Sequence, residues 1–195
     1  MRKFYYGLFS IFILGACDQE GHLESREVET TQIENIEIPG NIFESEKVNN
    51  SITEEEIKLS IKNYLDSSGD LYDARYYFEE ILDSGKELNK SDSEKLKEID
   101  ILLKENDENF STYILNNTLP GDYQYESERI SNYITALNQY LNELDNMIDN
   151  LTEGDLSKEN LKSLGNIPDI VNGKEQKKIE KFLEDKEIYT NVFKQ

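Results

Sequence analysis

The chain has 195 residues, of which 41 are acidic and 21 are lysine or arginine, so its formal net charge at pH 7 is −20. The phosphates of nucleic acids and anionic lipid headgroups would repel such a surface, which argues against direct binding to either. With a single cysteine, Cys17, the chain forms no internal disulfide and lacks the ligands of a zinc–thiolate site.

The N-terminal residues have the pattern of an export signal. Arg2 and Lys3 provide a positive region, and the apolar run Phe4–Leu14 is too short to cross a bilayer, which needs roughly 20 residues. The next residues complete the run Leu14-Gly15-Ala16-Cys17. This run resembles the lipobox of bacterial lipoproteins, which implies that residues 1–16 are removed and that a diacylglyceryl group is attached to Cys17. The alternative is a free thiol at the end of a secretory signal or a membrane helix.

Residues 17–50 are predicted to be an acidic, flexible tether. They carry nine acidic and two basic side chains, and Pro39-Gly40 interrupts any regular element. The few apolar residues of this segment offer a local contact with the domain that follows: Ile33, Ile36, Ile38, Ile42 and Phe43. Most of the segment lacks the apolar surface needed to offset the entropy lost on ordering.

Residues 51–195 are predicted to be an all-α domain, because apolar residues recur at helical spacing. Thr53-Glu54-Glu55-Glu56 reads as a capping box that opens a helix over 53–84, which Ser67-Ser68-Gly69 either breaks or kinks. Ser91-Asp92-Ser93-Glu94 repeats the box before a helix over 92–117, and Leu119-Pro120-Gly121 ends that helix.

The clearest period lies in a third helix, predicted over 123–152. Its apolar residues alternate between steps of four and three, the spacing of a coiled-coil seam: Ile130, Ile134, Leu137, Leu141, Leu144, Ile148 and Leu151. A short helix around 156–164 and a last helix over 174–187 follow. One architecture is a helical bundle, with a long antiparallel pair and the shorter helices 53–84 and 174–187. The other is an extended hairpin that dimerises through the 130–151 seam.

One short motif stands out, Asn106-Asp107-Glu108-Asn109-Phe110. It is similar to the N-D-x-x-F signature of small, functionally uncharacterised lipoproteins of staphylococci and their relatives, with Asn106, Asp107 and Phe110 at the fixed positions. The resemblance implies a cell-surface lipoprotein without a known activity. From spacing alone, Asn106 fixes helix register and Phe110 fills the core, while Asp107 turns to a flank and bonds a neighbouring element. The alternative is a partner groove near Phe110.

No catalytic constellation is predicted. The only histidine, His22, lies in the tether, and carboxylate pairs arise by chance on helices with this many acids. We expect no cofactor or metal, and a non-enzymatic, lipid-anchored module outside the cytoplasmic membrane that binds a protein or forms a homodimer through residues 130–151. The alternatives are a receptor for a small molecule or cation, and an inhibitor of a cell-envelope enzyme.

Overall fold

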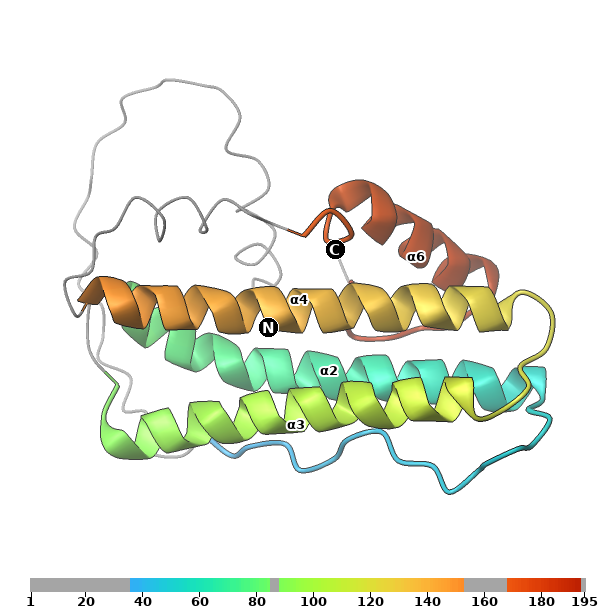
Figure 1. Ribbon diagram of the computed structural model, residues 1–195, viewed down its shortest axis with the longest axis horizontal. Helices are drawn as coiled ribbons and strands as arrows, with labels where there is room; N and C mark the ends of the chain where they lie inside the picture. Colours follow the sequence, from blue (N-terminus) through green and yellow to red (C-terminus); the bar gives the residue numbers. More distant parts are fainter. Residues whose placement is uncertain (1–35, 85–87, 153–167, 194–195) are drawn as a thin grey trace.

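The structure is a computed structural model that describes residues 36–84, 88–152 and 168–193. These residues form four α-helices, α2 (Glu54–Asp83), α3 (Lys90–Leu115), α4 (Tyr123–Thr152) and α6 (Gly173–Asp185). The three long helices lie side by side, and α6 packs on α4 (Figure 1). The all-α prediction is therefore confirmed. The signal sequence and the short helix expected around 156–164 lie outside the described residues.

Helix α2 has the bounds predicted for it, within one residue at each end. It has 30 residues, as many as α4, so the bundle contains three long helices rather than a long pair with shorter companions. The helix neither ends nor breaks at Ser67-Ser68-Gly69. The Ser68 hydroxyl donates to the Tyr64 carbonyl oxygen at 2.9 Å, so this polar side chain is satisfied within the helix.

The first predicted cap is confirmed and the second is wrong. The Glu56 amide donates to Thr53 Oγ1 at 3.3 Å, and the Thr53 amide donates to Glu56 Oε2 at 3.0 Å. Helix α3, in contrast, begins before Ser91, with Asn89 as its N-cap. Asn89 Oδ1 accepts from the Asp92 amide at 3.0 Å, because asparagine caps a helix as well as serine does.

Residues 36–52, here called the strap, lie along α2 and α3 in an extended path that Figure 1 shows below α3. Ile36, Ile38 and Ile42 pack on an apolar cluster that α2 and α3 form, and Phe43 is buried in the main core. The prediction of a flexible tether over 17–50 is therefore wrong for residues 36–50. The few apolar side chains of this segment suffice because asparagines of α3 and of the turn after it bind its backbone.

The end of the strap is paired with the turn between α3 and α4. The Ile52 amide donates to the Thr118 carbonyl oxygen, and the Thr118 amide donates to the Asn50 carbonyl oxygen, both at 2.9 Å. Lys47 forms an ion pair with Glu56 of α2, and this hydrogen bond lowers the pKa of Glu56 to about 2. The strap is thus fixed to both helices before the chain enters α2.

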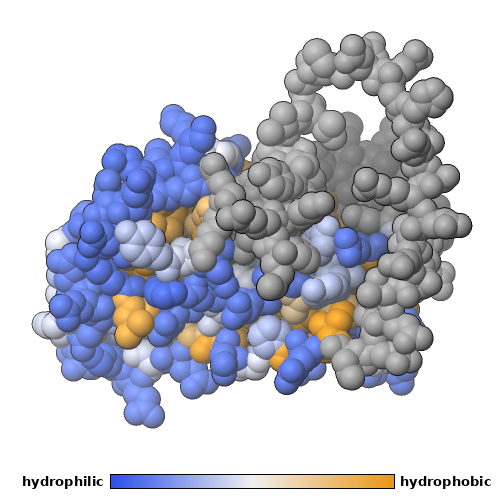
Figure 2. Space-filling view, turned by 180° about the vertical axis from the view of Figure 1, so that it is seen from behind, coloured by the Kyte–Doolittle hydropathy of each residue, from blue (hydrophilic) through white to orange (hydrophobic). Residues whose placement is uncertain are grey.

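The seam of α4 faces the interior of its own chain. Ile130, Ile134, Leu137 and Leu141 are buried in the same cluster as Ile57 and Ile61 of α2 and Ile179 and Phe182 of α6. Leu144 is partly buried, and the side chains of Ile148 and Leu151 lie outside the described residues. The first four seam residues therefore have partners without a second copy of the chain. The face seen in Figure 2 is mostly hydrophilic, with small separate hydrophobic patches.

Gly69 has a packing role in the middle of α2. A Cβ atom there would lie 2.5 Å from Asn191 Oδ1 and 3.0 Å from Val192 Cγ2. Asn191 also holds the C-terminal segment to α2, because its amide donates to Asp66 Oδ1 and its Nδ2 to Asp70 Oδ1, both at 2.8 Å. A glycine is needed here because the C-terminal segment crosses the helix so closely.

We expect Gly69→Ala to destabilise the protein although alanine is the better helix former. The intrinsic gain in the helix is about 1 kcal/mol, whereas forcing a methyl group into a packed contact costs about 1–3 kcal/mol and displaces Asn191. A fall of a few degrees in Tm, measured by circular dichroism, is the expected result. Gly173→Ala is the matched control, because nothing lies within 4 Å of its added Cβ. A Tm of Gly69→Ala above that of the wild type would contradict the close contact.

Candidate functional site

Asn106, on α3, joins the strap to α2 inside the protein. Its side chain is fully buried, and its Oδ1 accepts from the Phe43 amide at 2.7 Å. Its Nδ2 donates to Ser68 Oγ at 2.9 Å and to the Tyr64 carbonyl oxygen at 3.1 Å. One amide thus gives the buried Phe43 amide its partner and adds a bond to the Ser68–Tyr64 pair, which is already joined within α2. The expectation that a buried Asn106 fixes register agrees with this geometry.

Phe110 is the apolar half of the same junction. Its ring stacks on that of Tyr64, with centroids 4.2 Å apart and an interplanar angle of 4°. The ring of Phe43 meets Phe110 edge-on at 5.2 Å, while Asn109 Nδ2 donates to the Phe43 carbonyl oxygen at 3.0 Å. Phe43 is therefore held through its amide, its carbonyl and its ring by residues of one helical turn.

Asp107 faces another way, toward α4. Its Oδ1 accepts from the Tyr64 hydroxyl at 2.7 Å, and its Oδ2 accepts from Asn138 Nδ2 at 2.8 Å. Asn138 in turn accepts from the Tyr72 hydroxyl at 2.6 Å. Asp107 thus links α3 to α2 and α4 through neutral donors, which agrees with the prediction that it bonds a neighbouring helix.

The electrostatics of this network follow from burial. Asp107 is 6% exposed. Burial raises the pKa of its carboxyl above the ordinary 3.8, and hydrogen bonds from Tyr64, Asn138 and Thr135 offset this only in part. Burial and the negative charge of Asp107 also raise the pKa of Tyr64 and Tyr72 well above 10.0, so both phenols stay protonated and act as donors.

Asp107 lies on the lining of a groove between α3 and α4 with a volume of about 810 Å³. The α3 side contributes Asp100, Ile101, Lys104, Glu108, Ser111 and Thr112, and the α4 side contributes Thr135, Asn138, Gln139 and Asn142. Because Asp107 is nearly buried whereas Lys104 and Glu108 are exposed, its carboxylate belongs to the floor of the groove. A site of this size is in the range of ligand-binding pockets, about 300–1,000 Å³.

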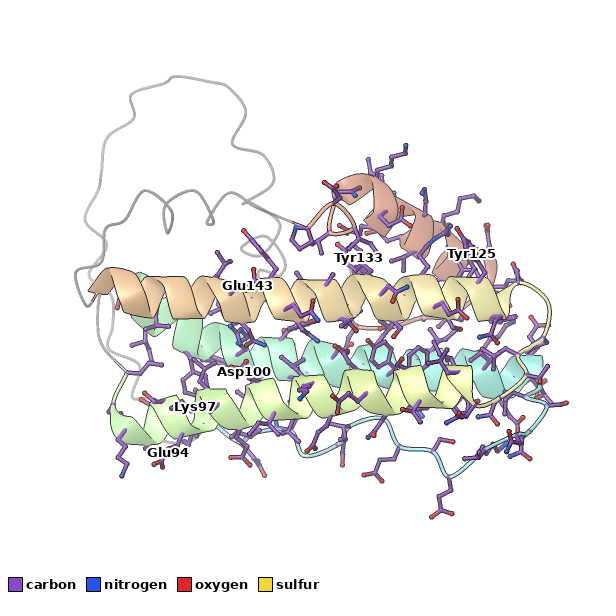
Figure 3. The ribbon with its side chains drawn as sticks, viewed as in Figure 1. Glu94, Lys97, Asp100, Tyr125, Tyr133 and Glu143 are labelled. Carbon is purple, nitrogen blue, oxygen red and sulfur yellow. The ribbon has the colours of Figure 1, made fainter. Side chains whose placement is uncertain are left out.

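The other charged residues near the groove are paired with one another. Asp100 forms an ion pair with Arg75 of α2, whose side chain is 2% exposed and also bonds Glu79 at 3.0 Å. Figure 3 shows Asp100 where α3 faces the other long helices. Lys104 Nζ lies 3.6 Å from Glu108 Oε1, one helical turn later on α3. Among the described residues, no ion pair reaches Asp107.

The structure brings together all three fixed residues of the N-D-x-x-F motif, whereas Cys17, Leu14, Gly15, Ala16 and His22 lie outside the described residues. Sequence reasoning missed Asn138 and Tyr72, which complete the interior network, and the buried Arg75, which pairs with Glu79 and Asp100. Asn138 directly follows Leu137 of the seam. Because polar residues often stand beside seam positions, nothing in the sequence pattern predicts that Asn138 is buried and bonded. The partners of Tyr72 and Arg75 are 66 and 25 residues away in sequence.

Within the described parts of the chain, no group of three or more histidine, cysteine, aspartate or glutamate side chains is placed to hold a metal ion. No helix among the same residues has the length and apolar character needed to cross a membrane. Comparison of the sequence with protein-family models and with curated proteins, and of the structure with solved structures, finds no match. The site is therefore interpreted from its own geometry.

We expect Asn106→Ala to destabilise the protein by about 1–3 kcal/mol, because it leaves the buried Phe43 amide without a partner. Urea unfolding measures this loss. Hydrogen exchange gives a local test, since the Phe43 amide should lose protection before the amides of α4 do. Glu105→Ala, an exposed substitution on the same helix, should change stability by less than about 0.5 kcal/mol. Equal stability of the two variants would contradict the role of Asn106.

Asp107→Asn should gain stability relative to the wild type as pH rises. Because the folded pKa of Asp107 exceeds its unfolded value near 3.8, the unfolded chain ionises first, and this residue's contribution to stability falls between those two pKa values. Asparagine does not titrate, so this loss occurs in the wild type alone. The unfolding free energy of the variant minus that of the wild type should therefore be lowest at about pH 3, rise with pH, and become constant above the folded pKa. Urea unfolding of both proteins across this pH range measures the difference. A difference that falls as pH rises would contradict the raised pKa of Asp107.

Proposed function

We propose that this chain is a lipid-anchored, extracytoplasmic module that binds a protein and catalyses no reaction. Arg2-Lys3, the short apolar run and Leu14-Gly15-Ala16-Cys17 support the anchor, since together they resemble a lipoprotein signal. Two long acyl chains suffice for stable membrane attachment, because each buried CH₂ contributes about 0.8 kcal/mol. In this proposal the mature chain begins at Cys17 and has a formal charge of −22.

One observation carries the proposed binding role, the groove between α3 and α4. It is built on two long helices whose spacing is set by the bonds among Asp107, Tyr64 and Asn138, so its floor is rigid. Its walls mix apolar and polar side chains, as protein-binding surfaces do. The strap lies along α2 and α3 and leaves this groove open to a partner.

The anchor and the domain are joined over a short stretch of chain. Eighteen residues separate Cys17 from Ile36, the first residue of the strap. Even fully extended, this stretch reaches at most about 65 Å. A partner in the membrane or close to it is therefore within reach of the groove, which favours an envelope protein as the partner.

The anchor is tested in the native host with Cys17→Ala. We expect the variant to lose the acyl mass found by mass spectrometry on the wild-type N-terminal peptide, and either to appear in the medium or to keep residues 1–16. His22→Ala, five residues beyond the cysteine, should mature and fractionate like the wild type. A Cys17→Ala protein that is processed and membrane-bound as before would overturn the anchor.

The binding role is tested in the same cells with a photo-crosslinking residue at Thr112 in the groove. We expect a discrete crosslinked envelope protein that is not obtained from Lys178, an exposed position on α6. The same product from both positions, or from neither, would overturn the groove as the binding surface. This readout does not depend on how the chain is attached to the membrane.

A further inference from the structure

We infer that the α3–α4 groove takes one lysine or arginine side chain of the partner protein, whose cationic group pairs with the Asp107 carboxylate. The inference rests on the proposed function, since it specifies the chemistry of the partner that the groove binds. Its basis is a nearly buried carboxylate that lines an open groove and has only neutral hydrogen-bond donors.

The Asp107 carboxylate can accept one more hydrogen bond than its neighbours supply. An ionised aspartate has about four acceptor positions. Tyr64, Asn138 and Thr135 provide three donors, all of them neutral. Nearly buried aspartates are seldom found without a cation, because removing the charge from water is costly. The network therefore has both an acceptor position and an electrostatic reason for a positive group arriving from the groove.

The cations of the described chain nearest the groove already have acidic partners. Arg75 is already held by Glu79 and Asp100 on the α2 side. Lys104 lies on the rim near Glu108, and its side chain is 73% exposed. Burial raises the pKa of Asp107, and the hydrogen bonds that lower it come from the neutral side chains of Tyr64, Asn138 and Thr135. The positive group that would complete this site comes from outside the described chain.

The lining of the groove suits both the stem and the backbone of a basic residue. Ile101 and the methyl groups of Thr112 and Thr135 give apolar surface for the alkyl stem of a lysine or arginine. Ser111, Gln139 and Asn142 give hydrogen-bonding groups for the partner's backbone. The overall charge of −20 attracts a basic protein over a long range, which favours a side chain on a basic partner over a neutral ligand.

The test uses the full chain in a nonionic detergent and a blocked pentapeptide, acetyl-Gly-Gly-Lys-Gly-Gly-amide, followed by NMR. We expect the peptide to shift the amide signals of Ser111, Thr112 and Thr135, and its norleucine counterpart to leave them unchanged. Asp107→Asn should weaken binding about tenfold or more, as the loss of about 1.4 kcal/mol does. Glu94→Gln removes the same charge from an exposed position on α3 and should bind like the wild type.

A groove-filling variant and a small amine give two further tests of the site. If Asp107→Asn fails to fold, Thr112→Trp fills the groove without touching the hydrogen-bond network and should abolish the shifts. If n-butylamine binds as tightly as the peptide, the site takes a free organic cation, and the protein side chain is overturned as its ligand. If Asp107→Asn binds the peptide as tightly as the wild type does, the attraction comes from the overall negative charge and not from Asp107. That result would overturn the site.

These outcomes are separate from those of the proposed function. A crosslink at Thr112 together with no peptide binding would keep the groove as a protein-binding surface and overturn the cationic side chain. Peptide binding without any crosslink would keep the site and overturn the protein-binding role in the cell.

Discussion

The structure depends on two adjacent buried polar side chains in the middle of α3, Asn106 and Asp107. Apolar helices alone slide and rotate against each other at little cost, whereas a buried amide or carboxylate must find its partners in one place. Asn106 finds them on α2 and the strap, and Asp107 finds them on α2 and α4. One turn of helix thereby sets the relative positions of three other segments, and a shift of any of them leaves a buried polar group unsatisfied.

The same turn of helix separates the closed side of the protein from its open side. Asn106, Asn109 and Phe110 hold the strap, which covers apolar residues of α2 and α3. Asp107 points instead between α3 and α4, where the groove lies. The network that supports the groove is continuous with the one that holds the strap, because Tyr64 bonds both Asp107 and Asn106. A rigid carboxylate with neutral donors is suited to binding a cation without first rearranging.

Sequence periodicity predicted the helices well, because each spacing rule concerns residues one or two turns apart. It also predicted the internal roles of Asn106 and Phe110, since a polar residue within an apolar row must be bonded. Asp107 was expected on a flank, bonded to a neighbouring element, and its near-complete burial was not predicted. The contact of the strap's apolar residues with the domain was among the expectations. The order of the whole strap was missed because it depends on asparagines about 65 residues further along the chain. The continuity of α2 at Gly69 was left open for a similar reason, since the segment that crosses it comes from the other end of the chain.

The position of the strap has a consequence for the proposed anchor. In that proposal, any pull from the membrane reaches the domain first through the strap and the buried Phe43. Phe43 is held by its amide, its carbonyl and its ring, so the load passes into the middle of α3 and not to the end of a helix. The groove opens between α3 and α4, away from the path of the strap. In that proposal the domain is held at one side of α3 while the groove on the other side binds the partner, which a tether joined directly to the groove would not allow.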